Sequence, residues 1–309
     1  MPDKKTLKDI FTIIFRLTVT CIVAGLIMGG AFVLTHDAKE RNEIERDQKV
    51  MYSLLGYDKQ NPPPKTMNLS PVHRFILDEN GSLSMGYVIP ATDEKSSILV
   101  RLDLEGTFIG QNPVEHAFGM QNNSDNERAV QQVLGDKIQS RYADTFLIAT
   151  DNHKRVAYIL DGKYPGFKTF IHVKMALNDK YDMLGFEVLE HEEDPGLGAE
   201  ITQPYFKNQF NGRSAEQLRN LDVSKEYPED YDDYLNALTG KLKDEKKKNE
   251  ILTKYSGDKH IYALTGATIS SRSVLNGNQS MVKKFVYRVE LLDKAIQSQN
   301  IQTMIRLDR

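Results

Sequence analysis

The segment 264–274 gathers hydroxyl-bearing and small side chains just before a long amphipathic stretch. It reads Leu-Thr-Gly-Ala-Thr-Ile-Ser-Ser-Arg-Ser-Val, with hydroxyls at Thr265, Thr268, Ser270, Ser271 and Ser273. Where a helix begins, unpaired N–H groups and the positive end of the helix dipole stabilise a phosphate. The pattern is therefore compatible with a phosphate-bearing ligand. Taken alone, however, a hydroxyl cluster before a helix more often indicates an ordinary N-cap.

A second cluster lies upstream, where His191-Glu192-Glu193-Asp194 runs into Pro195-Gly196-Leu197-Gly198. Glycines after a proline are typical of a tight turn. The histidine and acidic residues could suggest a metal, but adjacent residues at a strand end point in different directions. No second His or Cys cluster supports them. We therefore expect no metal centre here, and we assign no catalytic residue.

The amino-acid composition limits which cofactors and partners the chain can have. The only cysteine, Cys21, lies in an apolar N-terminal run, so the chain can build neither an internal disulfide nor a Cys-based iron–sulfur site. Redox chemistry would need a bound cofactor, because the chain's own side chains can form neither of these redox groups. The formal net charge is −3, with acids and bases mixed along the chain, so no basic stripe is available to follow a phosphate backbone. Nucleic acid is not an expected partner.

The apolar run from Leu17 to Leu34 is about long enough to cross a bilayer as a helix. A cleavable signal peptide is the alternative, but the run is long for one and no small-x-small cleavage site follows. Residues 1–16 are expected to form a cytoplasmic tail and residues 17–35 a transmembrane anchor. The short tail favours an inside N-terminus, which would place the rest of the chain on the outer face of the membrane.

Beyond the anchor, residues 36–64 are expected to form a helical stalk and linker, broken by Pro62-Pro63-Pro64. Short apolar runs separated by turn residues then predict antiparallel hairpins around 78–81, 151–154 and 178–182. Helical spacing appears at Glu127–Leu134 and most clearly between Val274 and Leu292. These patterns predict an α+β fold of antiparallel hairpins with flanking helices.

The expected organisation of the outer region has three parts. Residues 65–150 form its N-terminal part, residues 151–295 a ligand-binding domain, and residues 296–309 a C-terminal tail. Within the second part, residues 214–258 are highly charged with both signs present and few apolar side chains. We interpret this stretch as a solvated insertion rather than a binding tract.

At this point the residues resemble a known family. Thr265-Gly266-Ala267-Thr268 is similar to the [ST]-G-A-T flavinylation motif of the FMN-binding domains in RnfG, from the Rnf electron-transport complex, and NqrC, from the sodium-translocating NADH:quinone reductase. Ile269-Ser270-Ser271-Arg272 looks like the Rnf form. The upstream blocks Gly162-Lys163-Tyr164-Pro165-Gly166 and His191–Gly198 resemble the family's G-Y-x-G and H-x-E-T-P-G-L-G segments, in the right order.

The resemblance implies a covalent cofactor. In that family a flavin transferase links FMN through its phosphate to the last threonine of the motif, which is Thr268 here. The motif residues Thr265, Gly266 and Ala267, together with Ser270, would surround the phosphate. Two positions depart from the family: Tyr262 replaces an acidic residue and Asp194 a threonine. The remaining residues expected to contact the flavin are Glu193, Gly196, Leu197 and Gly198.

The function implied by the resemblance is electron transfer within a membrane-bound, ion-translocating complex of the Rnf type, between ferredoxin and NAD. Its expected partners are the other membrane subunits and a flavin transferase, and its expected location is the bacterial or archaeal plasma membrane. The equivalent quinone-reductase protein is the close alternative, and a non-redox scaffold protein is a second. An autonomous flavoenzyme is disfavoured because no G-x-G-x-x-G dinucleotide fingerprint is present.

Overall fold

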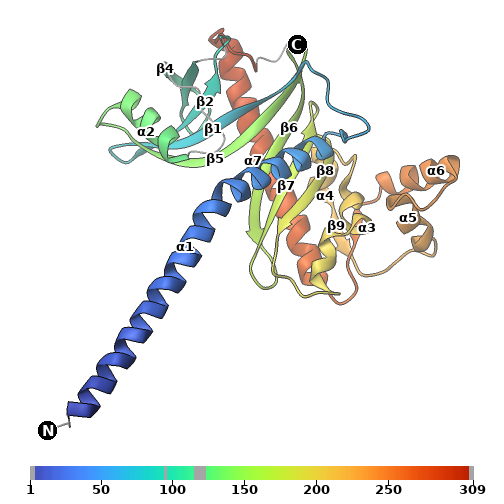
Figure 1. Ribbon diagram of the computed structural model, residues 1–309. Coiled ribbons are helices and arrows are strands. Elements are labelled where there is room, and N and C mark those ends of the chain that lie inside the picture. The colour runs from blue at the N-terminus through green and yellow to red at the C-terminus, as the bar shows by residue number, and fades with distance from the viewer. Residues whose placement is uncertain (1–3, 94–95, 115–122, 306–309) are drawn as a thin grey trace. The chain divides into compact units, whose positions relative to one another are not determined.

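A computed structural model describes residues 4–93, 96–114 and 123–305, and the chain divides into two compact units at Val50/Met51 (Figure 1). The first unit consists of α1 up to Val50, and the whole helix runs from Lys4 to Leu54. By length and composition, α1 can cross a membrane. This helix includes residues 4–16 of the expected tail, all of the expected anchor, and residues 36–54 of the expected stalk and linker.

The second unit is built on an eight-stranded sheet in the order β4-β3-β2-β1-β5-β6-β7-β8, and every neighbouring pair is antiparallel. The three predicted hairpins are confirmed as β1–β2, β5–β6 and β7–β8. The sheet runs through residues 150 and 151, so strands from both expected parts share it. In chain order the strands are β1 (Met67–Glu79), β2 (Ser82–Pro90), β3 (Ser97–Leu102), β4 (Phe108–Val114), β5 (Gln139–Asp151), β6 (Lys154–Pro165), β7 (Phe170–Asn178) and β8 (Met183–Glu190).

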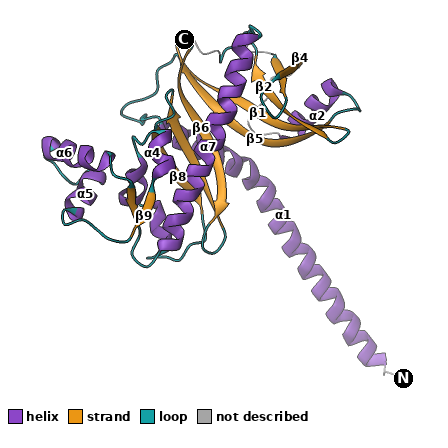
Figure 2. Cartoon of the chain, turned by 180° about the vertical axis from the view of Figure 1, so that it is seen from behind, coloured by secondary structure: helices purple, strands orange, loops and turns teal. Residues whose placement is uncertain are grey.

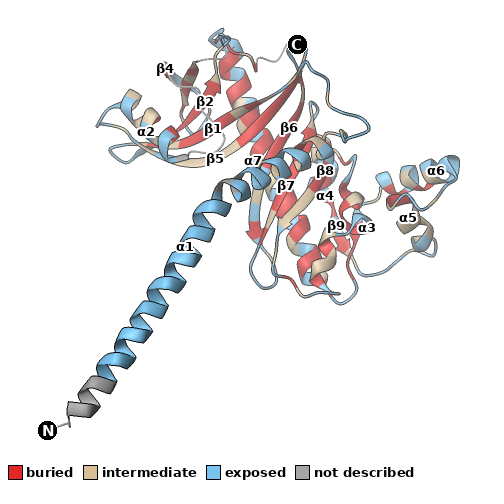
Figure 3. Cartoon of the chain, in the orientation of Figure 1, coloured by how far each residue is buried: buried red, intermediate tan, exposed pale blue. Residues whose placement is uncertain are grey.

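Helices cover both faces of the sheet. The C-terminal helix α7 (Thr268–Ser298) lies across one face and buries the apolar side chains that its periodicity predicted (Figure 2). On the other face, α2 (Asn123–Leu134) covers the β1–β4 part, and Met51 packs on Leu147, Ile159 and Ala176. Figure 3 shows the buried strands between exposed outer surfaces. The predicted α+β class is confirmed.

The charged segment 214–258, which we interpreted as a solvated insertion, contains regular secondary structure and a small hydrophobic core. It forms α4 (Ala215–Asn220), β9 (Asp222–Ser224), α5 (Tyr231–Leu238) and α6 (Glu245–Ser256), and β9 pairs in parallel with β10 (His260–Tyr262). Its small core combines tyrosines with aliphatic residues such as Leu238 and Ile251. The rings of Tyr234 and Tyr255 stack with centroids 4.1 Å apart. Aromatic bodies bury apolar area while their hydroxyls reach polar partners at the rim.

Short helices connect β8 to this segment: η1 (Gly198–Thr202), α3 (Pro204–Lys207) and η2 (Asn208–Phe210). Arg213 then joins them to the end of α6. Its buried guanidinium donates to the carbonyl oxygens of Tyr255, Ser256 and Asp258 at 2.7–2.8 Å, which satisfies a helix C-terminus. Burial lowers the pKa of Arg213.

Close contact between α7 and β6 depends on Gly277. A methyl group at this position would lie 2.3 Å from Cδ1 of the Tyr164 ring. We expect Gly277→Ala to lower the free energy of unfolding by about 1–3 kcal/mol through overpacking, even though alanine is the better helix former. Urea unfolding of the detergent-solubilised chain, followed by circular dichroism, measures the change. The neighbouring exposed residue provides the control: Asn276→Ala should change stability by less than about 0.5 kcal/mol, and equal effects would contradict the packing account.

Candidate functional site

Thr268 is the first residue of α7, the longest helix of the second unit. Ala267 is the N-cap residue and offers no side-chain cap, so the alternative in which Thr268 itself caps the helix is wrong. Thr268 is half-buried, and its hydroxyl has no hydrogen bond within the described part of the chain. A reactive or ligand-binding hydroxyl is therefore left available beside the N–H groups of the first helical turn.

The loop before Thr268 is held by Ser271. The hydroxyl of this fully buried serine accepts from the N–H of Leu264 and donates to the carbonyl oxygen of Ala267, both at 3.0 Å. Between these anchors Gly266 adopts φ +73°, which a side-chain-bearing residue rarely does. Leu197 lies over the same glycine, since its Cδ2 is 2.9 Å from the position that a Cβ would take.

Glu193 joins three segments at the start of α7. Its buried carboxylate accepts from the Ser270 hydroxyl, and from the backbone N–H groups of Phe167 and Lys168 at 2.7 and 3.3 Å. Gly198 packs directly on this pair, because a Cβ there would lie 2.6 Å from both Glu193 Oε2 and Ser270 Oγ. The upstream loop and the threonine motif therefore meet, as the ligand-binding hypothesis requires.

The loop from Asp194 to Gly198 is a closed turn. The carbonyl oxygen of Asp194 accepts from the N–H groups of Leu197 and Ala199 at 3.1 and 3.0 Å, and Gly196 has φ +74°. The side chain of Asp194 accepts from the Lys168 ammonium, and this hydrogen bond raises the pKa of Lys168. At this position the carboxylate fixes the loop to the β6–β7 turn.

Tyr227, which sequence reasoning did not select, contacts the motif from the charged segment. Its hydroxyl donates to the carbonyl oxygen of Ala263 at 2.7 Å and lies 3.2 Å from Oγ1 of Thr265. Tyr262 is buried beside it and donates to Asp258 at 2.7 Å, while burial raises its pKa. The only sequence signal for Tyr227 was its place among tyrosines in a segment interpreted as solvated.

Exposed apolar side chains lie on the segments that meet near the start of α7. Leu197, Phe167 and Ile269 are 45%, 57% and 59% exposed, and each belongs to one of the segments that Glu193 and Gly266 bring together. An exposed apolar rim around a helix N-terminus can hold a flat apolar ring and a phosphate at the same time. Fold and site thus fit a domain that could hold a phosphate-bearing aromatic cofactor at the start of α7.

Comparison with known proteins identifies that cofactor. Residues 166–283, which include both motifs, match the model of the FMN-binding domain family. This segment of the chain is therefore similar to FMN-binding domains, as the resemblance to the family shared by RnfG and NqrC led us to expect. Which residues contact FMN stays a prediction, although the structure places all nine predicted residues in one site.

Two relatives show the setting of such domains. The chain is 27% identical over 136 residues to the G subunit of the proton-translocating ferredoxin:NAD(+) oxidoreductase complex of Clostridium ljungdahlii, covering 44% of the chain and 57% of the relative. It is 21% identical over 244 residues to the C subunit of the Na(+)-translocating NADH-quinone reductase of Pasteurella multocida, covering 77% and 85%. The chain thus spans little more than half of the first relative. Both relatives belong to ion-translocating oxidoreductase complexes.

Among solved structures, the chain is similar to Shewanella oneidensis NqrC, with a TM-score of 0.43 and 15% sequence identity. The alignment covers 82% of this chain and 99% of that one.

The two loop glycines should respond differently to alanine. Gly198→Ala would push a methyl group between Glu193 and Ser270, so we expect bound flavin per protein, measured by absorbance, to fall several-fold. Gly196→Ala meets no neighbouring atom and strains only the backbone, at a cost of about 1 kcal/mol, so flavin should be largely retained. Equal flavin loss in both variants, at equal expression, would contradict a specific role for the Glu193–Ser270 pair.

Proposed function

We propose that the chain is an electron-carrier subunit of a membrane-bound, ion-translocating redox complex, with FMN joined to Thr268 by a phosphoester bond. The observation that carries this proposal is the position of Thr268 inside the FMN-binding domain. It is the first residue of α7 and has an available hydroxyl beside the first-turn N–H groups, and exposed apolar side chains lie on the adjoining segments.

The other hydroxyls of the motif have structural partners. Ser270 donates to Glu193, Ser271 bridges Leu264 and Ala267, and Thr265 lies against the Tyr227 hydroxyl. Attachment at Thr268 would form a bond between its Oγ1 and the FMN phosphorus. The bond from that phosphorus to a leaving nucleotide would break, and the hydroxyl proton would pass to a base of the flavin transferase.

The chain's own residues would bind and orient the cofactor. FMN supplies the capacity to accept and release electrons. The first-turn N–H groups of α7 would stabilise the phosphodiester charge, and Leu197 with its exposed apolar neighbours would cover one part of the ring. Glu193 would hold the loop and the helix in a fixed relation, so that the flavin has one position for electron transfer.

The relatives' names supply the proposed setting. We favour an Rnf-type complex, transferring electrons between ferredoxin and NAD, on the basis of the motif continuation and the Clostridium relative. The equivalent protein of a sodium-translocating NADH:quinone reductase is the alternative, supported by the longer but weaker match. The proposed partners are the other membrane subunits and, for maturation, a flavin transferase.

We further propose a single-pass location in the bacterial or archaeal plasma membrane, with α1 as the anchor and the FMN-binding domain outside the cytoplasm. The supporting observations are the apolar length of α1 and the membrane complexes of the relatives. Covalent attachment suits this location, because a flavin lost outside the cytoplasm could not readily be replaced.

Thr268→Ala tests the attachment site directly. Wild-type protein produced with a flavin transferase should carry in-gel flavin fluorescence after denaturing electrophoresis and a mass increase equal to one FMN moiety. Thr268→Ala should lose both signals, because it lacks the acceptor oxygen. Thr265→Ala keeps that oxygen and should retain at least part of the label.

Persistent covalent flavin on Thr268→Ala would show that another residue is the acceptor. A wild-type protein without flavin, produced beside a labelled relative as positive control, would favour the scaffold function. The wild-type result is informative because Tyr262 stands at a position where the family has an acidic residue.

Topology has its own test. Alkaline phosphatase fused after Arg309 should be active, because a single span with an inside N-terminus exports the C-terminus. A β-galactosidase fusion at the same residue should be inactive. The reverse pattern would contradict the proposed location, although not flavin binding.

A further inference from the structure

The sheet opens between β5 and β6. These strands pair only between residues 146–151 and 154–160. Earlier in β5, residues 139–145 pair with β1 alone, and later in β6, residues 161–165 pair with β7 alone. Each segment therefore presents one strand edge whose alternate N–H and C=O groups are outside the ladder. We call the opening between these two edges the notch.

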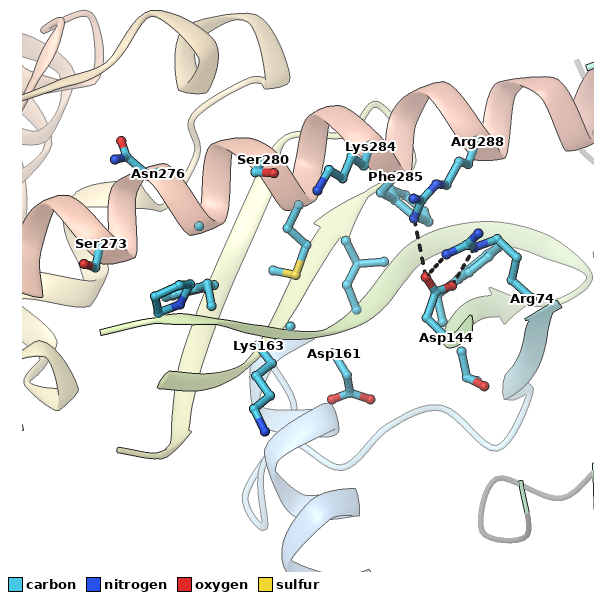
Figure 4. A pocket seen from close by; sticks show the side chains of 18 residues that line it. Arg74, Asp144, Asp161, Lys163, Ser273, Asn276, Ser280, Lys284, Phe285 and Arg288 are labelled. Carbon is cyan, nitrogen blue, oxygen red and sulfur yellow. Dashed lines mark hydrogen bonds and ion pairs between the residues drawn. The ribbon is translucent and has the colours of Figure 1, made fainter. Parts of the chain in front are cut away.

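A cavity of about 700 Å³ fills the notch, with α7 along one side of it (Figure 4). Residues 160–165 of β6 supply more of the lining than residues 144–146 of β5. The α7 wall carries polar side chains, namely Ser273, Asn276 and Ser280. The walls thus offer backbone and side-chain hydrogen bonds rather than a continuous apolar surface.

The charge in the notch is predominantly positive. Arg74 binds Asp144, with Nε–Oδ1 at 2.9 Å, and Arg288 approaches the same carboxylate at 3.4 Å, so one anion is shared by two guanidinium groups (Figure 4). Lys284 lines the cavity without an ion pair among the residues that the structure describes. The notch can therefore stabilise added negative charge.

The second anion in the lining does not offset this excess. Asp161 is paired with Lys174 of β7 at 2.7 Å. Lys163 lies over the Phe170 ring, 4.9 Å from its centroid, and points away from α7 (Figure 4). Cationic groups consequently stand on both sides of the free β6 edge, with Lys284 and Arg288 on the α7 side and Lys163 on the other.

We propose that the notch binds an extended acidic segment of a partner polypeptide, which adds to residues 161–165 of β6 as a further strand. Backbone hydrogen bonds to the free edge would provide binding, and carboxylates facing α7 would meet Lys284 and Arg288. Pro165 ends the edge, because it has no N–H to donate, so the added strand is short.

A diffusible anion would use only the charges, whereas the paired strand edges favour a peptide backbone. The proposal does not rest on flavin attachment, because none of the nine predicted flavin contacts lines this cavity. The notch and the flavin site do share α7, which places a docking surface on the same rigid helix as the proposed redox centre.

Peptide binding to the full-length chain in detergent tests the chemistry. The probe is a short fluorescein-labelled peptide of alternating threonine and glutamate, measured by fluorescence anisotropy. One comparison peptide has lysine for glutamate. Another has proline for threonine, so it keeps the charge but cannot pair as a strand. The acidic strand peptide should bind at least about tenfold more tightly than either. Equal binding of the proline peptide would overturn strand addition and leave an electrostatic anion site.

Neighbouring lysines of α7 provide a matched pair of variants. Both Lys283 and Lys284 are exposed, but only Lys284 lines the cavity. Lys284→Glu should weaken binding of the acidic peptide by about tenfold, since it removes an attraction and adds a repulsion. Lys283→Glu makes the same change in net charge and should alter binding by less than about twofold. Equal effects would overturn the assignment to the notch.

Protection in native membranes tests whether a partner occupies the notch. In a Cys21→Ser background, Ser280→Cys should react more slowly with a bulky maleimide in membranes containing the assembled complex than in the isolated chain. Lys283→Cys, exposed on the same helix, should react equally in both. Equal reactivity of Ser280→Cys in both preparations would overturn occupation by a partner, whatever the outcome at Thr268.

Discussion

The buried carboxylate of Glu193 determines how the candidate site is assembled. It lies among a hydroxyl donor from α7 and two N–H donors from the β6–β7 turn, so its charge is compensated although it is only 5% exposed. A buried carboxylate without these donors would cost several kcal/mol. Helix α7, the β6–β7 turn and the loop that contains Glu193 must therefore pack together for the carboxylate to be hydrogen-bonded. Gly166 and Gly198 leave the space for this packing.

One helix connects the features that follow from this assembly. α7 begins at Thr268, contacts β6 through Gly277, and further along its length lines the notch with Lys284 and Arg288. Because a helix of this length is rigid compared with loops, Thr268, the proposed attachment residue, and the notch keep a constant separation. Binding at the notch would thus position the redox centre relative to a partner without any change at the flavin site.

The sequence predicted what depends on local pattern. Turn residues predicted the positions of the three hairpins, and helical periodicity predicted α7. The order of the two motifs, 191–198 and 265–268, predicted which segments form the candidate site. It could not predict that β5 and β6 separate at residue 160, since divergence of strands depends on what each pairs with on its other side. It also missed Tyr227, because contact with Thr265 requires a chain reversal of almost forty residues. Composition described the segment 214–258 as solvated, whereas tyrosine rings give it a core.

The four hydroxyls of the motif show most clearly where sequence reasoning ends. Thr265, Thr268, Ser270 and Ser271 are chemically similar and lie within a few residues, so spacing alone could assign any of them to a cap, a loop contact or a ligand. Their partners come from elsewhere: Glu193 for Ser270, Tyr227 for Thr265, and the motif's own backbone for Ser271. Local or tertiary contacts occupy three of these four hydroxyls. The fourth, that of Thr268, has no hydrogen bond in the described structure and stands where the helix dipole favours a phosphate.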